Sequence, residues 1–336
     1  MDWSLILSNT VRSGFSQTAI IYILAAMGLN LHIGYTGLLN FGQVGFMAMG
    51  AYGLGITTYT YDLPLWLGIL VGLAAGMVFA VLLGIPTLRL RSDYLAIVTI
   101  AAAEIVRLVA RYQGWKDWSG GTNGLNGFAN DFQEWNPLTS SKKYGLKIGP
   151  LDLNFTGGDI WEIAIGWSLI LVGVYVLFRL TNSPWGRVIK SIREDEDAAR
   201  ALGKSIFVFK MQSLVIGGLF GTVAGMFFAL ANNSVQPDNY GRPVTFFALT
   251  IAIIGGLGRV WGPVVGGMIF WVLLSGVENL LRQAVENDHL PTSIIDGVQV
   301  GQVRFMLVGL GLMLLMIFRP QGIFGDKREI SIDVRK

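Results

Sequence analysis

The chain has 336 residues, of which 52% are hydrophobic and only 14% are charged, with a mean hydropathy of +0.54. Soluble domains carry about 25% charged residues, so this sequence has too little charge to cover a water-facing surface. The composition excludes an ordinary soluble enzyme, a disordered chain and a nucleic-acid binder, and it predicts a polytopic membrane protein. The sequence contains no cysteine, and its two histidines, His32 and His289, lie far apart. We therefore expect no disulfide, no metal site and no cofactor.

Apolar runs that could cross a bilayer recur along the chain. A hydrocarbon core of roughly 30 Å needs about 20 apolar residues in a helix. Such runs occupy 15–34, 41–60, 65–85, 94–111, 160–180, 207–231, 244–258, 261–281 and 302–318. We therefore expect an all-α bundle of about eight to ten transmembrane helices, because lipid-exposed backbone must satisfy its own hydrogen bonds. The bundle would form a single domain over 1–325, followed by a tail at 326–336.

The stretch from 34 to 60 differs from the other runs because it is rich in glycine. Each glycine weakens a helix by up to about 1 kcal/mol relative to alanine, so we expect a broken or re-entrant segment. An unpaired buried amide is costly. The amides in this segment should therefore either bond the broken backbone or face a hydrated solute path. Our candidate pathway residues are Gly37, Asn40, Phe41 and Gln43. The alternative, that these amides only tie helices together, stays open.

Two other patterns concern helix packing. Charged residues at helical spacing (Glu104, Arg107 and Arg111; Glu278 and Arg282) are predicted to neutralise one another. Glycines at a spacing of four predict closely packed helix faces. The three glycine series are Gly68/Gly72/Gly76, Gly217/Gly221/Gly225 and Gly258/Gly262/Gly266.

Basic residues predict the orientation in the membrane. They gather in the gap 181–206, in the turn 86–93 and in the C-terminal tail, and alternating spans place all three regions on one side. Because cytoplasmic loops carry an excess of Lys and Arg, we expect these regions in the cytoplasm and 112–158 outside.

Residues 184–205 should form a cytoplasmic helix. A helix-forming run extends without interruption from Val188 to Leu202, and Gly203 follows as a C-cap. The small residues Ala198 and Ala199 would give a smooth surface that another protein could receive. Gly203-Lys204-Ser205 completes a relaxed phosphate-loop pattern, but no strand precedes it, so we expect no nucleotide site.

Five motifs stand in order along the chain: GYTGLLNFGQ at 34–43, PTLRLR at 86–91, DAARALG at 197–203, GGLGRVWGP at 255–263 and RPQGIFG at 319–325. Together they resemble those of the branched-chain amino-acid permeases of ABC importers, and of their LivM type more than of the LivH type. Asn40 and Gln43 depart from the usual Ser and His of the first motif, and Asp197 replaces the Glu of the "EAA---G" coupling motif.

The resemblance implies a permease of the bacterial inner membrane that imports leucine, isoleucine and valine. Its partners would be a related LivH-type permease, two cytosolic ABC ATPases, an extracytoplasmic solute-binding protein and the lipid bilayer. The ATPases would hydrolyse the ATP, and this chain would not be an enzyme. Residues implied in ATPase coupling are Glu194, Glu196, Asp197, Ala198, Ala199 and Gly203. Two alternatives stay open: an ABC permease for urea or short amides, and an ATP-independent channel or secondary transporter for small polar solutes.

Overall fold

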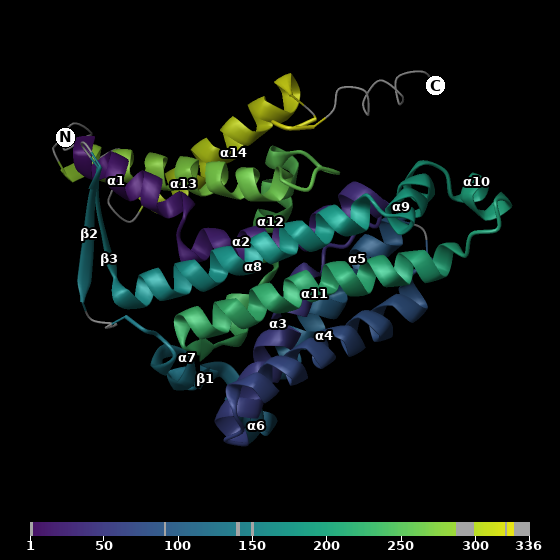
Figure 1. Cartoon of the computed structure of the whole chain (residues 1–336), viewed down its shortest axis with the longest axis horizontal. Helices are drawn as coiled ribbons and strands as arrows, with labels where there is room; N and C mark the ends of the chain where they lie inside the picture. Colours follow the sequence, from purple (N-terminus) through teal and green to yellow (C-terminus); the bar gives the residue numbers. More distant parts are fainter. Residues whose placement is uncertain are drawn as a thin grey trace.

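The structure is a computed structural model that describes residues 3–90, 92–138, 142–148, 151–286, 299–319 and 321–325. Within these ranges the chain is almost entirely helical and carries two small two-stranded sheets (Figure 1). The α-helices are α1 (Trp3–Gly14), α2 (Gln17–Leu29), α3 (Gln43–Gly55), α4 (Leu65–Thr87), α5 (Ser92–Arg111), α6 (Lys116–Ser119), α7 (Asn130–Glu134), α8 (Gly157–Thr181), α9 (Pro184–Glu194), α10 (Glu196–Ala201), α11 (Ile206–Asn232), α12 (Arg242–Gly255), α13 (Gly262–Glu286) and α14 (Val300–Phe318). The strands are β1 (Leu125–Asn126), β2 (Lys143–Ile148), β3 (Leu151–Thr156) and β4 (Ser234–Val235).

Six helical stretches among the described residues are long and apolar enough to cross a membrane. They are Ile6–Tyr35, Leu65–Thr87, Gly157–Thr181, Ile206–Asn232, Gly262–Val285 and Val300–Phe318. The expected all-α polytopic membrane protein is therefore confirmed. Helices α3, α5 and α12 also occupy the ranges predicted from the apolar runs, and the total of eight to ten spans stays a prediction. Helix α1 was not among the expected elements.

The long helices run between two ends of the molecule. Figure 1 shows α9 and α10 at one end and the β2–β3 hairpin at the other. The predicted cytoplasmic and extracytoplasmic segments thus lie at opposite ends, as alternating spans require. Which end faces the cytoplasm stays a prediction, and the tail at 326–336 lies outside the described residues.

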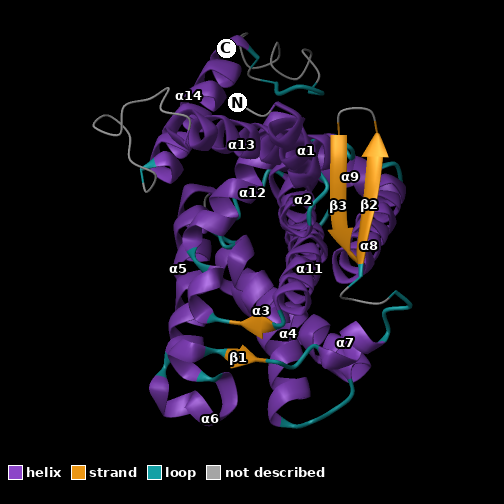
Figure 2. Cartoon of the chain, turned by 90° about the vertical axis from the view of Figure 1, so that its left-hand side faces the viewer, coloured by secondary structure: helices purple, strands orange, loops and turns teal. Residues whose placement is uncertain are grey.

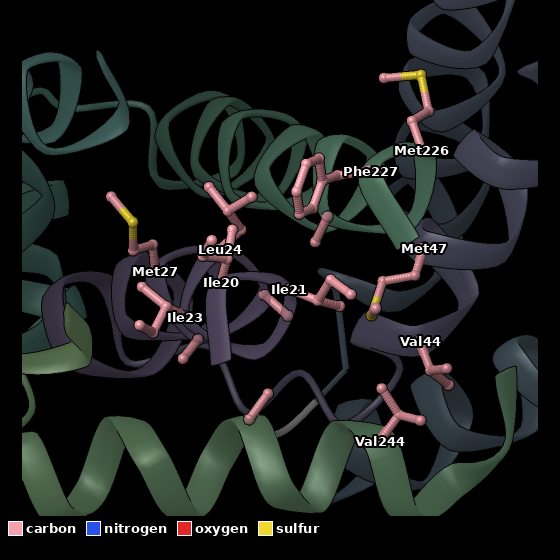
Figure 3. Packing of buried hydrophobic residues seen from close by; sticks show 14 of the residues in the cluster. Ile20, Ile21, Ile23, Leu24, Met27, Val44, Met47, Met226, Phe227 and Val244 are labelled. Carbon is pink, nitrogen blue, oxygen red and sulfur yellow. The ribbon is translucent and has the colours of Figure 1, made fainter. Parts of the chain in front are cut away.

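The core of the bundle is centred on α2. Every residue from Ile23 to Leu29 is buried, because α2 is apolar on all sides and a helix of that kind packs in the interior. Side chains of α3, α11 and α12 pack around it, with Phe227 against the α2 isoleucines and Val44 beside Val244 (Figure 3). Helix α14 lies at the periphery, where most of its residues are exposed. The glycine-rich α3 is buried at nearly all of its positions, because other helices enclose it.

Glycines allow α3 to approach its neighbours closely. A Cβ atom at Gly72 of α4 would lie 2.8 Å from the carbonyl oxygen of Gly50, and one at Gly221 of α11 would lie 2.6 Å from Nε2 of Gln43. The first two glycine series therefore do form tight helix contacts. The third prediction was wrong, because Gly258, with φ of 74°, lies in the turn before α13 rather than on a helix face.

The segment after α5 contains more structure than the sequence suggested. Strands β2 and β3 pair antiparallel from Lys143 opposite Thr156 to Ile148 opposite Leu151, and they stand beside α8 in Figure 2. Strand β1 pairs with β4, which begins two residues after α11 ends, so distant parts of the chain meet at this end of the bundle.

Candidate functional site

The predicted broken segment begins where α2 ends. Residues Asn30–Tyr35 form a π-helical turn, residues 37–42 are not helical, and α3 starts at Gln43. Gly37 has φ of 74°, a left-handed conformation that glycine adopts without strain. The chain then turns back, and the N–H of Leu38 donates to the His32 carbonyl at 2.8 Å. We call residues 37–42 the break.

Hydroxyl groups of other helices satisfy the backbone around the break. The N–H of Phe41 donates to Oγ1 of Thr99 on α5, and the N–H of Val44 donates to Oγ1 of Thr245 on α12, both at 3.0 Å. An unsatisfied backbone group inside a membrane costs several kcal/mol, so interruptions of a helix need such partners. Sequence reasoning missed both threonines, because they are distant in the chain and sit in ordinary apolar runs.

The two candidate amides lie inside the bundle and bond within the chain. Asn40 is 1% exposed and Gln43 is 0% exposed. Nδ2 of Asn40 donates to Oε1 of Gln43 at 3.2 Å, and its Oδ1 accepts from the N–H of Gly42 at 2.9 Å. Nε2 of Gln43 donates to the carbonyl of Gly217 on α11 at 3.0 Å. The amides thus join the break to α3 and α11, and their contact with a solute stays a prediction.

His32 completes this network, although its sequence position suggested only a histidine near a span end. It is fully buried. Nδ2 of Asn40 donates to its Nδ1 at 3.1 Å, and its Nε2 lies 3.3 Å from the carbonyl oxygen of Leu214. Both partners fit one neutral tautomer, with the proton on Nε2. The available signal was the density of polar residues between Asn30 and Gln43 in an otherwise apolar stretch.

The other two candidate pathway residues lie at the edges of the break. Gly37 is exposed, whereas Phe41 is half-buried, with its ring centroid 6.1 Å from that of Phe246. The structure brings Asn40 and Gln43 into one network and leaves Gly37 and Phe41 outside it.

The expected uninterrupted helix over Val188–Leu202 is wrong. The chain is extended at Asp195, and α9 and α10 are separate helices. Oδ1 of Asp195 accepts from the N–H groups of Asp197 and Ala198 at 2.9 and 3.0 Å. Asp is a strong N-cap because its carboxylate satisfies free N–H groups, and that preference overrides helix continuation within the acidic run.

The candidate coupling residues divide into exposed and inward-facing groups. Ala199 is 2% exposed and packs against Ile192 and Ile206, so it does not contribute to an outer surface as the sequence suggested. Glu196 pairs with Lys210 of α11. The residues Glu194, Asp197 and Ala198 are exposed. Gly203 has φ of 74° after the end of α10, as expected for a C-cap.

Helix α9 contacts the chain just before the break. The guanidinium of Arg193 donates to the carbonyl of Gly34. Nζ of Lys190 lies 5.4 Å from the ring centroid of Tyr35, within the range of a cation–π interaction. A Cβ atom at Gly37 would lie 3.3 Å from Cγ of Arg193. The two segments singled out from the sequence are therefore in direct contact.

Charged residues near the other end of α5 form a network, as their spacing predicted. Both Nε and Nη2 of Arg107 donate to Glu104, and Nη1 of Arg107 donates to Asp238 at 2.8 Å. Arg111 also contacts Asp238, at 3.3 Å. The sequence did not reveal Asp238 as the shared partner, because it lies in the turn before α12.

A family model described as "Branched-chain amino acid transport system / permease component" matches residues 12–317. The chain belongs to this family. It is 34% identical to the high-affinity branched-chain amino acid transport system permease protein LivM of Salmonella typhimurium and 33% identical to that of Escherichia coli, in each case over 90% of this chain and 68% of the relative. It is also similar, at 25% identity over 94% of both chains, to a probable LivM of Methanocaldococcus jannaschii. The protein is a permease component of an ABC transporter and a multi-pass protein of the bacterial inner membrane.

Proposed function

We propose that this chain is one of two related membrane subunits of a binding-protein-dependent importer, and that the importer carries leucine, isoleucine and valine. The relatives that are a third identical over most of this chain are branched-chain amino-acid permeases. The partner permease would be of the LivH type. An extracytoplasmic binding protein would deliver the solute, and two cytosolic ATPases would hydrolyse ATP, so that this chain performs no catalysis itself.

The contact between α9 and the chain at the break is the observation that carries the proposed coupling to an ATPase. Helices α9 and α10 project from one end of the bundle (Figure 1). Arg193 and Lys190 of α9 hold Gly34 and Tyr35, which directly precede the break. A protein that pushed on α10 would therefore displace the point at which a membrane-embedded chain changes direction.

The mechanism that we propose follows from this contact. We place α9 and α10 in the cytoplasm, where the exposed residues Glu194, Asp197 and Ala198 would face an ATPase. Closure of the ATPases around nucleotide would move α10, and rocking of packed helices is a common way to convert such a displacement. Arg193 would pass the movement to the break, and the amides of Asn40 and Gln43 would exchange their internal bonds for a solute. Transport is directional only if the outward and inward states bind the solute differently.

The test is reconstitution of the complete importer in vesicles, with labelled leucine supplied on its binding protein. Uptake should require ATP on the cytoplasmic side, and unlabelled isoleucine and valine should compete while urea and acetamide should not. Competition by urea or acetamide would favour the amide alternative. Leucine uptake without ATP would favour a channel or a secondary transporter.

A second measurement in the same vesicles tests the link through α9. In Arg193→Gln, ATP hydrolysis should continue while leucine uptake falls at least tenfold, because the contact with Gly34 is lost. The matched control is Arg187→Gln, an exposed position on the same helix, which should transport normally. Equal uptake by the two variants would contradict the proposed coupling route.

A further inference from the structure

A cavity of about 780 Å³ lies at the α9–α10 end of the bundle, where several helices begin or end. Its walls come from the chain just after the end of α4, from the first turns of α5 and α11, from α10 and from the start of the break. The lining residues are Gly37, Leu38, Leu88, Arg89, Leu90, Leu95, Glu196, Arg200, Ile206, Phe207 and Lys210. Because the cavity lies at the ends of α4 and α11, which are long and apolar enough to cross a membrane, we expect it at the level of the membrane–water interface.

The cavity carries an excess of positive charge. Lys210 pairs with Glu196, and Arg200 pairs with Asp197 at 2.7 Å. Arg89 has no carboxylate partner among the residues that the structure describes, and its guanidinium carbon lies 5.9 Å from the ring centroid of Phe207. One cationic group thus remains for a ligand with a single negative charge.

The backbone of α11 adds hydrogen-bond donors to the same wall. Ile206 and Phe207, the first two residues of α11, line the cavity, and no side chain caps this helix at Ser205. The first N–H groups of a helix have no partner inside the helix, and together with the helix dipole they favour an anion. The N-terminus of α11 therefore adds to the preference for an anionic ligand that Arg89 creates.

Exposed apolar side chains of α4 precede the first lining residues of this segment by one to two helical turns. On α4, Leu82 is 66% exposed and Ile85 is 51% exposed, and Leu90 of the lining is exposed as well. The walls also contain Leu88, Leu95 and Phe207. An amphiphile with an anionic head and hydrocarbon chains matches both halves of this site, whereas a free amino acid would need an unpaired carboxylate for its ammonium group.

We propose that this cavity binds the phosphodiester headgroup of an anionic phospholipid, with Arg89 as the principal contact and the acyl chains along α4. Basic pockets between helices at the cytoplasmic side recognise such headgroups in this way. That this lipid belongs to the inner leaflet rests on the proposed function, which places α9 and α10 in the cytoplasm. Because Arg200 and Glu196 belong to α10, a bound lipid would also steady the helix that we expect to meet the ATPase.

The test uses the purified full chain in mild detergent, without ATP, solute or partner subunits, so its result is independent of the proposed function. Binding of phosphatidylglycerol is measured by native mass spectrometry, and protection is measured by thermal melting. Phosphatidylcholine with the same acyl chains, inorganic phosphate and leucine serve as comparison ligands. The parent protein should bind phosphatidylglycerol most tightly and gain the most thermal protection from it.

Arg89→Gln should weaken phosphatidylglycerol binding about fivefold, the effect of one basic residue near an anionic headgroup. Arg89→Lys should retain most of the affinity. The matched control is Arg179→Gln, because Arg179 also lies near the end of a membrane-spanning helix with an aromatic ring at 5.9 Å but does not line the cavity. If Arg89→Gln does not fold, Arg89→Met, which keeps an unbranched side chain without the charge, replaces it with the same expectation.

Four results would overturn the proposal. Equal protection by phosphatidylcholine would show that the site does not recognise the negative charge of the headgroup. Equal protection by inorganic phosphate would show that the hydrocarbon chains are not used, and equal protection by leucine would identify a solute site. Equal loss of phosphatidylglycerol binding in Arg89→Gln and Arg179→Gln would show that the cavity has no special role.

Discussion

At the scale of single residues, the break depends on side chains that substitute for missing helical hydrogen bonds. Asn40 serves three groups at once: the Gly42 N–H, Oε1 of Gln43 and Nδ1 of His32. Thr99 and Thr245 satisfy two further backbone donors. Buried polar networks of this kind are stable only when every member is bonded, because an unpaired group in a low-dielectric interior is costly. The break is therefore sensitive to the loss of any one member.

Asn40→Leu should destabilise the protein by about 2 kcal/mol, because it leaves Oε1 of Gln43 and the Gly42 N–H buried without partners. Gln43→Leu should have a similar effect through the carbonyl of Gly217. The double variant should cost less than the sum of the two single changes, since the residues share a bond. Chemical or thermal unfolding in detergent measures these differences.

The control for this experiment is Asn232→Leu. Asn232 is exposed at the end of α11, and among the described residues its side chain bonds only the carbonyl of Phe228 in its own helix. Its loss should therefore change stability little. If Asn40→Leu and Gln43→Leu melted like the parent and only uptake fell, the network would not be a stabilising element. A pathway role alone would then explain both residues.

At the scale of elements, α9 and α10 show how a short helix can be both anchored and exposed. Ala199 packs between Ile192 and Ile206, Glu196 reaches Lys210, and Asp195 caps the first turn. Ala198, by contrast, is exposed, and Leu202, directly after α10, is 77% exposed. An exposed leucine beside small residues is a suitable contact for another protein.

The neighbouring alanines of α10 separate anchoring from docking. Ala198→Trp adds a bulky ring to the exposed side and should leave the melting temperature unchanged, while it lowers co-purification of the ATPases at least tenfold. Ala199→Trp overfills the contact with Ile192 and Ile206 and should cost about 1–3 kcal/mol, as overpacking usually does. Normal ATPase binding by Ala198→Trp would contradict the assignment of this surface.

The sequence predicts the long elements of this fold better than their interruptions. The apolar run at 160–180 corresponds to α8 (Gly157–Thr181), and that at 207–231 corresponds to α11 (Ile206–Asn232), because hydropathy over about 20 residues is set by the bilayer itself. The glycine content indicated the break. The sequence did not reveal the division between α9 and α10 at Asp195. In a run of four acidic residues, no local pattern shows which one will act as an N-cap and end the preceding helix.

The candidate site is only partly visible in the sequence for a related reason. Asn40 and Gln43 stand out as polar residues in an apolar stretch. Their partners do not, because the carbonyl of Gly217 and the hydroxyls of Thr99 and Thr245 come from three other helices. Contacts of this kind depend on helix packing, which no local pattern of residues encodes.

At the scale of the whole molecule, charge differs between the two ends of the bundle. Near the β2–β3 end, arginines pair with acidic residues, as Arg12 does with Asp159 at 3.1 Å and Arg107 with Glu104 and Asp238. At the α9–α10 end, Arg89 and Arg179 have no carboxylate partner among the described residues, and each lies near an aromatic ring. An excess of Lys and Arg in cytoplasmic segments is the pattern that orients membrane proteins. The α9–α10 segment carries such an excess, with Arg187, Lys190, Arg193, Arg200 and Lys204.

This difference predicts that α10 faces the cytoplasm and α6 faces outward. The natural chain has no cysteine, so single cysteines can report the two ends without background. Exposed positions suit the experiment, and we choose Lys204→Cys beside α10 and Asp117→Cys in α6. In intact cells a membrane-impermeant maleimide should label position 117 at once and position 204 only after the membrane is permeabilised. The opposite order would invert the topology, and it would place α9, α10 and their contact with Gly34 beyond the reach of a cytosolic ATPase.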